Sequence, residues 1–282
     1  MSGAGEETEF RELPPEVKAV LEAHRRWVAS EGREGAKASL RKADLSRTDL
    51  QGAQLCEADL SGADLSKADL QDARLRGADL SEASLMQARL SRADLRGVDL
   101  QRSRLQKVDL NGADLRGAKL NGAGLEGAML RKASLQGAAL APVVLELADL
   151  AEADLSGASL QEANLGGAEL RGANLRGANL KKARLQGANL WGADLREAQL
   201  QRADLREADL TRAGLQGADL RGARLQGAAF VQADLQGANL QKLKFQDVDL
   251  YKANLQGADL RGADLADATG ITRAQRESAR TE

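Results

Sequence analysis

The sequence predicts an elongated all-β solenoid built from one short repeat. Starting at Leu40, every fifth residue through position 265 is Leu, apart from Phe230 and Phe245, which makes 46 consecutive repeats without a shift of frame. A small residue, usually Ala, lies two positions before each of these residues, and a polar residue separates the two. Aromatic residues make up only 2% of the 282 residues, too few to fill the interior of a compact globule. The core is therefore expected to be narrow and repetitive.

A period of five fits neither a regular helix nor a flat strand. On a helix, which turns about 100° per residue, a stripe with this period would spiral around the surface and bury no face. On a strand the apolar set would change faces at each repeat, because the strand period is two and five is odd. The pattern fits a chain that turns a corner once per repeat, with the small residue and the Leu both pointing inward. Gly is frequent two residues after the Leu, where the corner would fall.

A few repeats depart from this pattern at the small position. These departures mark places where the interior must accommodate a different side chain: Thr48, Val98, Ser103, Val108, Val143, Leu243 and Val248.

The repeat resembles that of a known family. Residues 58–62 (ADLSG) and 188–192 (ANLWG) are similar to the A(D/N)LXX unit of pentapeptide repeat proteins, and the resemblance covers residues 38–267. It implies a right-handed quadrilateral parallel β-helix with four repeats per coil and one repeat per face. The array would then form about 11–12 coils, spaced about 4.8 Å apart like neighbouring strands, in a rod of roughly 55 Å.

The N-terminal region is expected to cover one end of the rod. We expect residues 1–12 to form a disordered leader and residues 13–37 to form a capping helix and turn. Pro14 and Pro15 open a helix that runs over 14–30, and Gly32 ends it. One face of this helix carries residues expected to pack on the open end of the β-helix: Val17, Val20, Leu21, His24 and Trp27.

The C-terminal region, residues 268–282, is expected to form a tail with a short helix. The repeat frame breaks at Gly270, and Thr272 is a suitable N-cap for the segment that follows it. Because this segment is polar, we expect it to cover little of the last coil. Gyrase-inhibiting members of the family dimerise through this end, so a homodimer formed there is a further expectation.

The residues needed for catalysis or metal binding are scarce. The chain has one His and one Cys, so no nucleophile–base–orienter set is available, and we expect no enzyme activity, no cofactor and no metal site. Cys56 follows a Leu position and is expected to be an ordinary surface residue. The many Asp residues occupy the polar position of the repeat, where they are expected to bond local backbone and not calcium. One Cys and the absence of a signal sequence or membrane span predict a cytoplasmic protein.

The charge of the chain bears on its partners. The formal net charge is −2, and acids and bases alternate, so that one face sums to +3 and the other three to −1, −2 and −1. The quinolone-resistance members of the family imitate DNA with strongly negative faces and occupy the DNA site of gyrase. That mechanism requires a dense anionic surface, and no face of this chain is strongly acidic in total.

Direct nucleic-acid binding is disfavoured, because the bases of the +3 face are interleaved with acids and no aromatic platform lies among them. These bases include Arg41, Lys42, Lys181, Lys182 and Lys242.

Two outward-facing groups of residues are less polar than the rest. One is a column at intervals of 20 toward the C-terminal end: Trp191, Thr211, Val231, Tyr251 and Ile271. Such a stripe is either a partner site, or it reflects cross-strand pairing or cover by the tail. The second is the patch of Pro142, Val144 and Leu147, which is either a small contact site or a local bulge.

These observations favour a non-enzymatic, rod-shaped scaffold that presents β-helix faces to a protein partner of unknown identity. The alternative is a DNA-mimicking protein that binds gyrase or another topoisomerase and protects it from poisons. An ice- or crystal-binding protein is disfavoured, because it needs regular Thr ladders and Thr is rare.

Overall fold

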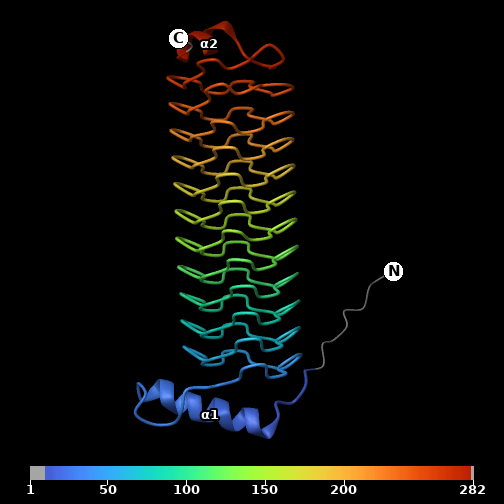
Figure 1. Ribbon diagram of the computed structural model, residues 1–282, viewed down its shortest axis with the longest axis vertical. Helices are drawn as coiled ribbons and strands as arrows, with labels where there is room; N and C mark the ends of the chain where they lie inside the picture. The colour runs from blue at the N-terminus through green and yellow to red at the C-terminus, as the bar shows by residue number, and fades with distance from the viewer. Residues whose placement is uncertain (1–9, 281–282) are drawn as a thin grey trace, which may run out of the picture.

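The protein forms a straight column of stacked coils with a helix at each end (Figure 1). The computed structural model describes residues 10–280. Helix α1 spans Pro15–Ala29 and lies at the N-terminal end, and helix α2 spans Arg273–Ser278 and lies at the C-terminal end. In the described residues, neither helix is long and apolar enough to cross a membrane.

The coils contain 20 residues each, or four repeats. With one exception described below, the middle residue of each repeat from Ser39 to Asp249 forms a parallel bridge with the residue 20 positions later, as in Ser39 with Asp59 and Asp59 with Asp79. The Leu N–H of one coil donates to the carbonyl beside the next coil's Leu, for example from Leu40 N to Asp59 O at 2.7 Å. Each repeat contributes one bridging residue, so the faces are too short for extended strands. The expectation of a parallel β-solenoid with four repeats per coil is confirmed.

The corners of the coils require a left-handed backbone. The second residue after nearly every Leu has a φ near +60°, whether it is Gly62 (66°) or Lys42 (54°). An amide N–H one residue beyond the corner donates back to the Leu carbonyl, as in Ala43 N to Leu40 O at 3.1 Å, and closes the turn. The left-handed conformation is ordinarily adopted by Gly. Here many Lys, Arg and Glu residues adopt it as well, because this turn and the ladder beyond it are repeated in every coil.

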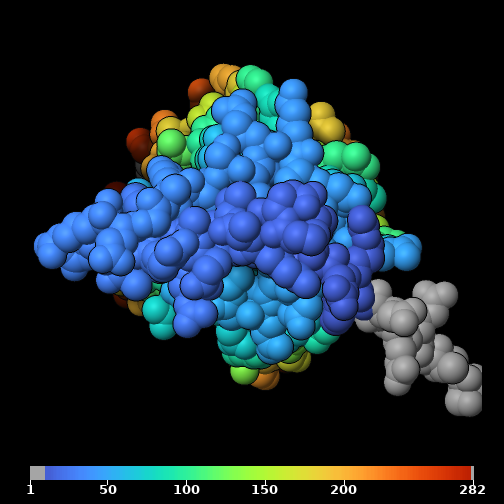
Figure 2. Space-filling model, turned by 90° about the horizontal axis from the view of Figure 1, so that it is seen from below, coloured from blue at the N-terminus to red at the C-terminus, as the bar shows by residue number. Residues whose placement is uncertain are grey.

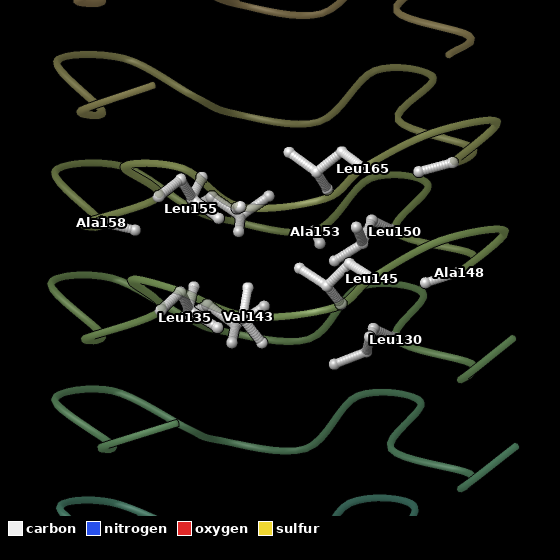
Figure 3. Packing of buried hydrophobic residues seen from close by; sticks show 14 of the residues in the cluster. Leu130, Leu135, Val143, Leu145, Ala148, Leu150, Ala153, Leu155, Ala158 and Leu165 are labelled. Atoms are coloured by element: carbon white, nitrogen blue, oxygen red, sulfur yellow. The ribbon is translucent and has the colours of Figure 1, made fainter. Parts of the chain in front are cut away.

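The interior consists of Leu and Ala ladders (Figure 3). Leu155, Leu165 and Ala153 are fully buried, as are their equivalents through most of the array. Leu fills the inner space and Ala leaves room for it, which explains why the small position alternates with the large one. Each Leu contributes roughly 2 kcal/mol of burial.

Helix α1 lies across the N-terminal end of the column (Figure 2). Val17 is buried, and Val20 and Leu21 pack partly against the core. His24 is fully buried and stacks on Trp27, with ring centroids 5.5 Å apart. These five side chains, placed in a cap by the sequence analysis, therefore all lie at this end of the rod.

The leader includes one residue that is tied to the first coil. Arg11 N donates to Arg47 O at 2.7 Å, and the Arg11 guanidinium contacts Asp44 at 2.8 Å. Arg11 falls within the leader expected to be disordered, whereas it is held here by backbone pairing. Residues 1–9 of that leader lie outside the described residues.

The C-terminal tail covers more of its end than its polar sequence predicts. Thr272 caps α2 in a capping box with Gln275. The Gln275 amide donates to Leu250 O at 3.2 Å and to Ala253 O at 2.8 Å, and Arg280 pairs with Asp259 as a further coil would. Backbone and amide groups provide this cover together with Ile271 and Ala279, which pack partly against the core. Homodimerisation through this end remains a prediction.

Candidate interaction surface

The described residues contain no group of side chains suited to chemistry. The Cys56 thiol is half-buried, and its Sγ lies 3.7 Å from the Arg74 carbonyl oxygen. His24 is buried in the cap, where its Nδ1 accepts a hydrogen bond from Ala38 N at 3.0 Å. No cluster of three or more His, Cys, Asp or Glu suited to a metal occurs between residues 10 and 280.

The Asp and Asn residues of the repeat bond to local backbone. Their Oδ1 atom accepts a hydrogen bond from the amide two residues later, as from Gln51 to Asp49 at 3.0 Å and from Trp191 to Asn189 at 3.0 Å. A side chain engaged in this turn is oriented along the face, with one oxygen already occupied.

Many of these carboxylates are also neutralised by an Arg two residues later. Arg96 donates through Nε and Nη2 to the two oxygens of Asp94 at 2.8 and 2.6 Å, and Arg116 makes the same fork with Asp114. The fork lowers the pKa of Asp94 and raises that of Arg96. The same arrangement occurs at residues 194/196, 204/206, 219/221 and 259/261. These forks are not among the features predicted from the sequence, although the motif Asp-Leu-Arg could have indicated them.

The predicted C-terminal stripe forms one column on one face. Backbone bonds connect its successive members: Gly192 N donates to Thr211 O, and Arg212 N donates to Val231 O. Trp191 is 38% exposed and Tyr251 is 50% exposed, while Thr211 and Val231 are half-buried.

Cationic side chains lie over the two aromatic rings of this stripe. The Arg212 guanidinium carbon is 5.5 Å from the Trp191 ring centroid, and Lys252 Nζ is 5.1 Å from that of Tyr251. Ile271 differs from the other four members, because it packs partly against the core as the tail turns inward. The tail therefore leaves Tyr251 open to solvent.

The patch of Pro142, Val144 and Leu147 lies at the middle of the rod. Val144 keeps the ladder, bridging Gly124 below and Asn164 above, so no residue is inserted. The turn itself is irregular: the Ala141–Pro142 peptide is cis, and Gly122 N donates to Pro142 O instead of the preceding carbonyl. Leu147, at the next corner, is 70% exposed. The distortion is thus a changed turn within an intact frame.

A shallow hollow adjoins this turn. It encloses about 510 Å³, and Pro142 and Val144 line its apolar side. Glu162 and Lys182 line the other side and pair with each other at 2.8 Å.

One interruption of the ladders was not expected. Arg224 and Lys244 form no bridge, whereas every other pair of polar positions 20 apart from Ser39 to Thr269 does. Ala223, beside the gap, is 8% exposed, unlike the nearly inaccessible Ala residues elsewhere. The cause lies in Leu243 and Phe245, which place two enlarged side chains on the inner side of one face. Their departure from the repeat was the available signal.

Comparison with protein families gives one match. The model described as pentapeptide repeats matches in eight overlapping copies that together span residues 38–141 and 148–267. The six unmatched residues between these spans include Pro142, Val144 and Leu147, where the turn is irregular. No curated protein sequence matches this chain significantly.

Several solved structures are similar. HetL, a pentapeptide repeat protein involved in heterocyst differentiation regulation from the cyanobacterium Nostoc sp. strain PCC 7120, is 38% identical. The alignment covers 74% of this chain and 91% of HetL, with a TM-score of 0.51. A trypsin-treated variant of QnrB1, a plasmid-mediated fluoroquinolone resistance protein, is 24% identical over 67% of this chain and 88% of QnrB1, with a TM-score of 0.45.

Proposed function

Because the chain belongs to the pentapeptide repeat family, we propose that it is a non-enzymatic, rod-shaped scaffold that binds a protein partner through the faces of a right-handed quadrilateral β-helix. The stripe of Trp191, Thr211, Val231 and Tyr251 is the proposed docking surface. HetL, which is involved in the regulation of a differentiation process, has a role that protein contacts can carry.

The observation that carries this proposal is the exposure of two aromatic rings in one column of a largely polar surface. Trp and Tyr are enriched at the energetic centres of protein interfaces. Trp191 and Tyr251 lie three coils apart, about 14 Å, with the smaller Thr211 and Val231 between them. A partner that lies along the rod would contact both rings at once. Arg212 and Lys252 would supply hydrogen bonds at the rim.

The experiment is a quantitative affinity capture with cell extract of the source organism. The baits are the wild type and the double variant Trp191→Ala/Tyr251→Ala. A matched control carries Met129→Ala, which removes an exposed apolar side chain outside the stripe. We expect a protein that is retained by the wild type and the control to be lost from the stripe variant. Equal capture by all three baits would refute this docking surface.

The alternative function is gyrase binding by imitation of DNA. The rod shape supports it. The carboxylates do not, because the Arg forks neutralise many of the charges that would stand in for phosphates. A gyrase supercoiling assay separates the two functions.

A further inference from the structure

One edge of the rod carries a charge pattern that the other edges lack. We define the Arg47 edge as the corner residues found at intervals of 20 from position 47 to position 267. Its N-terminal half is basic and its C-terminal half is acidic. From end to end the residues are Arg47, Lys67, Gln87, Lys107, Gly127, Leu147, Gly167, Gly187, Glu207, Gly227, Asp247 and Asp267.

The six charged side chains of the Arg47 edge have no partner in the part of the chain that the structure describes. Among residues 10–280, none of them forms an ion pair or a side-chain hydrogen bond. Charged corner residues on the adjacent edges instead pair along the rod, as Arg102 does with Glu82 and Arg92 with Asp72. The segregation of charge on the Arg47 edge therefore leaves three bases and three acids available to another molecule.

A second copy of this chain has the complementary pattern. If two copies lie antiparallel with these edges in contact at full overlap, a two-fold axis passes between positions 147 and 167. Position 47 then lies opposite 267, position 67 opposite 247, and position 107 opposite 207. Each of these three pairs joins a base to an acid, and the two-fold axis repeats each pair, which gives six ion pairs.

The uncharged positions match as well. Gly127 lies opposite Gly187, and Gln87 lies opposite Gly227, so the backbones can approach closely. At the centre, the exposed Leu147 of each copy lies opposite Gly167 of the other. Because the column is straight and its frame never shifts, one pair in register places all the others in register (Figure 1).

We propose that the protein forms an antiparallel homodimer through the Arg47 edge. The other edges do not support such an arrangement at full overlap. The edge that begins at Lys42 places Arg102 opposite Arg202, and the edge that begins at Gly52 places Arg92 opposite Arg212. The fourth edge carries only two charged residues, Glu57 and Glu197, and both lie opposite Gly.

The dimensions predict a weak, salt-sensitive dimer. The edge spans eleven coil spacings, about 53 Å, and a contact strip about 10 Å wide would bury roughly 1,000 Å² in total. That area is at the low end for specific interfaces, so association in the micromolar range is expected. Because the ion pairs lie near the surface, added salt weakens them.

Sedimentation velocity of the full chain tests the proposal. At tens of micromolar and low salt, we expect a species of twice 29.9 kDa that dissociates as salt is added. Arg47→Glu/Lys67→Glu/Lys107→Glu makes the edge wholly acidic and should raise the Kd at least about 100-fold. Glu207→Lys/Asp247→Lys/Asp267→Lys makes it wholly basic and should do the same. An equimolar mixture of these two variants should form a heterodimer, because every pair is again complementary.

The matched control reverses the same number of bases on another edge. Lys42→Glu/Arg202→Glu/Lys242→Glu changes the net charge equally and should leave the dimer intact. Circular dichroism of each variant checks that the fold is retained. A monomeric wild type under these conditions would overturn the proposal. A dimer that survives both edge reversals would also overturn it, and would indicate association through another surface such as the C-terminal end.

Discussion

At the scale of single residues, the polar position of the repeat has two tasks. Its carboxylate or amide closes the local turn, as Asp44 does by accepting from Ser46 N at 3.0 Å. Its second oxygen is then free to bind a base. Hydrogen bonds from the Ser46 hydroxyl and the Arg11 guanidinium lower the pKa of Asp44 to about 2. The Asp residues at the polar position of the repeat therefore belong to the turn, and several of them also to its charge pairing.

The buried Leu positions are expected to dominate stability. Leu155→Ala should lower the free energy of unfolding by about 2–5 kcal/mol, because it removes buried methyl groups and leaves a cavity in a ladder that cannot collapse. Leu147→Ala, the same substitution at an exposed corner, should cost less than about 0.5 kcal/mol. Chemical denaturation of both variants measures the difference. Similar losses for the two would contradict the assignment of Leu155 to the core.

His24 is expected to make the N-terminal cap sensitive to pH. Burial lowers its pKa below the usual 6.5, and its Nδ1 must stay unprotonated to accept from Ala38 N. The unfolded chain therefore binds a proton more readily than the folded chain as pH falls. The stabilisation is fully present above pH 6.5 and is lost below it, by at most about 1.4 kcal/mol per pH unit.

The measurement is the free energy of unfolding between pH 7.5 and 5 for the wild type and His24→Asn. The Asn side chain can accept from Ala38 N without titrating. We expect the wild type to lose stability across this range and the variant to show a flatter profile. Parallel profiles would show that His24 is not the group responsible.

At the scale of the coil, the break between Arg224 and Lys244 shows how far the interior can be filled. Phe230 alone is accommodated, because Ala228 on the same face is small. The backbone pairing is kept there, since Phe230 N still donates to Asp249 O at 2.7 Å. Leu243 and Phe245 together enlarge both inward positions of one face, and the backbone bridge between Arg224 and Lys244 is lost there.

This gap predicts a local difference in hydrogen exchange. The amides of Leu225 and Lys244 make no hydrogen bond among residues 10–280, so they should exchange much faster than the amide of Leu205, which donates to Arg224 O at 2.8 Å. Leu243→Ala/Phe245→Leu restores the repeat and should protect both amides. Slow exchange of both amides in the wild type would contradict the gap.

The sequence predicts regular elements better than their exceptions. The five-residue period was enough to place the Leu and Ala side chains in the interior, because a narrow column can bury only one large and one small residue per repeat. Their stacking at intervals of 20 followed from the four repeats per coil that the family resemblance implies. The helix boundaries followed from Pro15 and from Thr272. The cover provided by Gln275 could not be predicted, since it depends on where an amide meets the last coil in space. The Asp–Arg forks likewise depend on side-chain geometry across one face.

At the scale of the whole molecule, the rod is nearly neutral overall but carries two distinct surfaces, the charged Arg47 edge and the aromatic stripe. The proposed dimer would use the Arg47 edge, whereas the stripe of Trp191 and Tyr251 lies at the next corner of the coil and would stay accessible. The two-fold axis would place both stripes on the same side of the dimer. A partner with two binding sites would then bind more tightly than a partner with one.

The central claim is that this rod acts through protein contacts and does not imitate DNA. The most direct measurement is a supercoiling assay with purified gyrase, with and without a quinolone, at several salt concentrations. Because Arg forks neutralise six of the Asp carboxylates and the remaining acids are balanced by bases, we predict neither inhibition nor rescue from the drug at micromolar protein. Salt-sensitive inhibition, or protection from the drug, would contradict the claim and would mean that the shape of the rod suffices for gyrase binding.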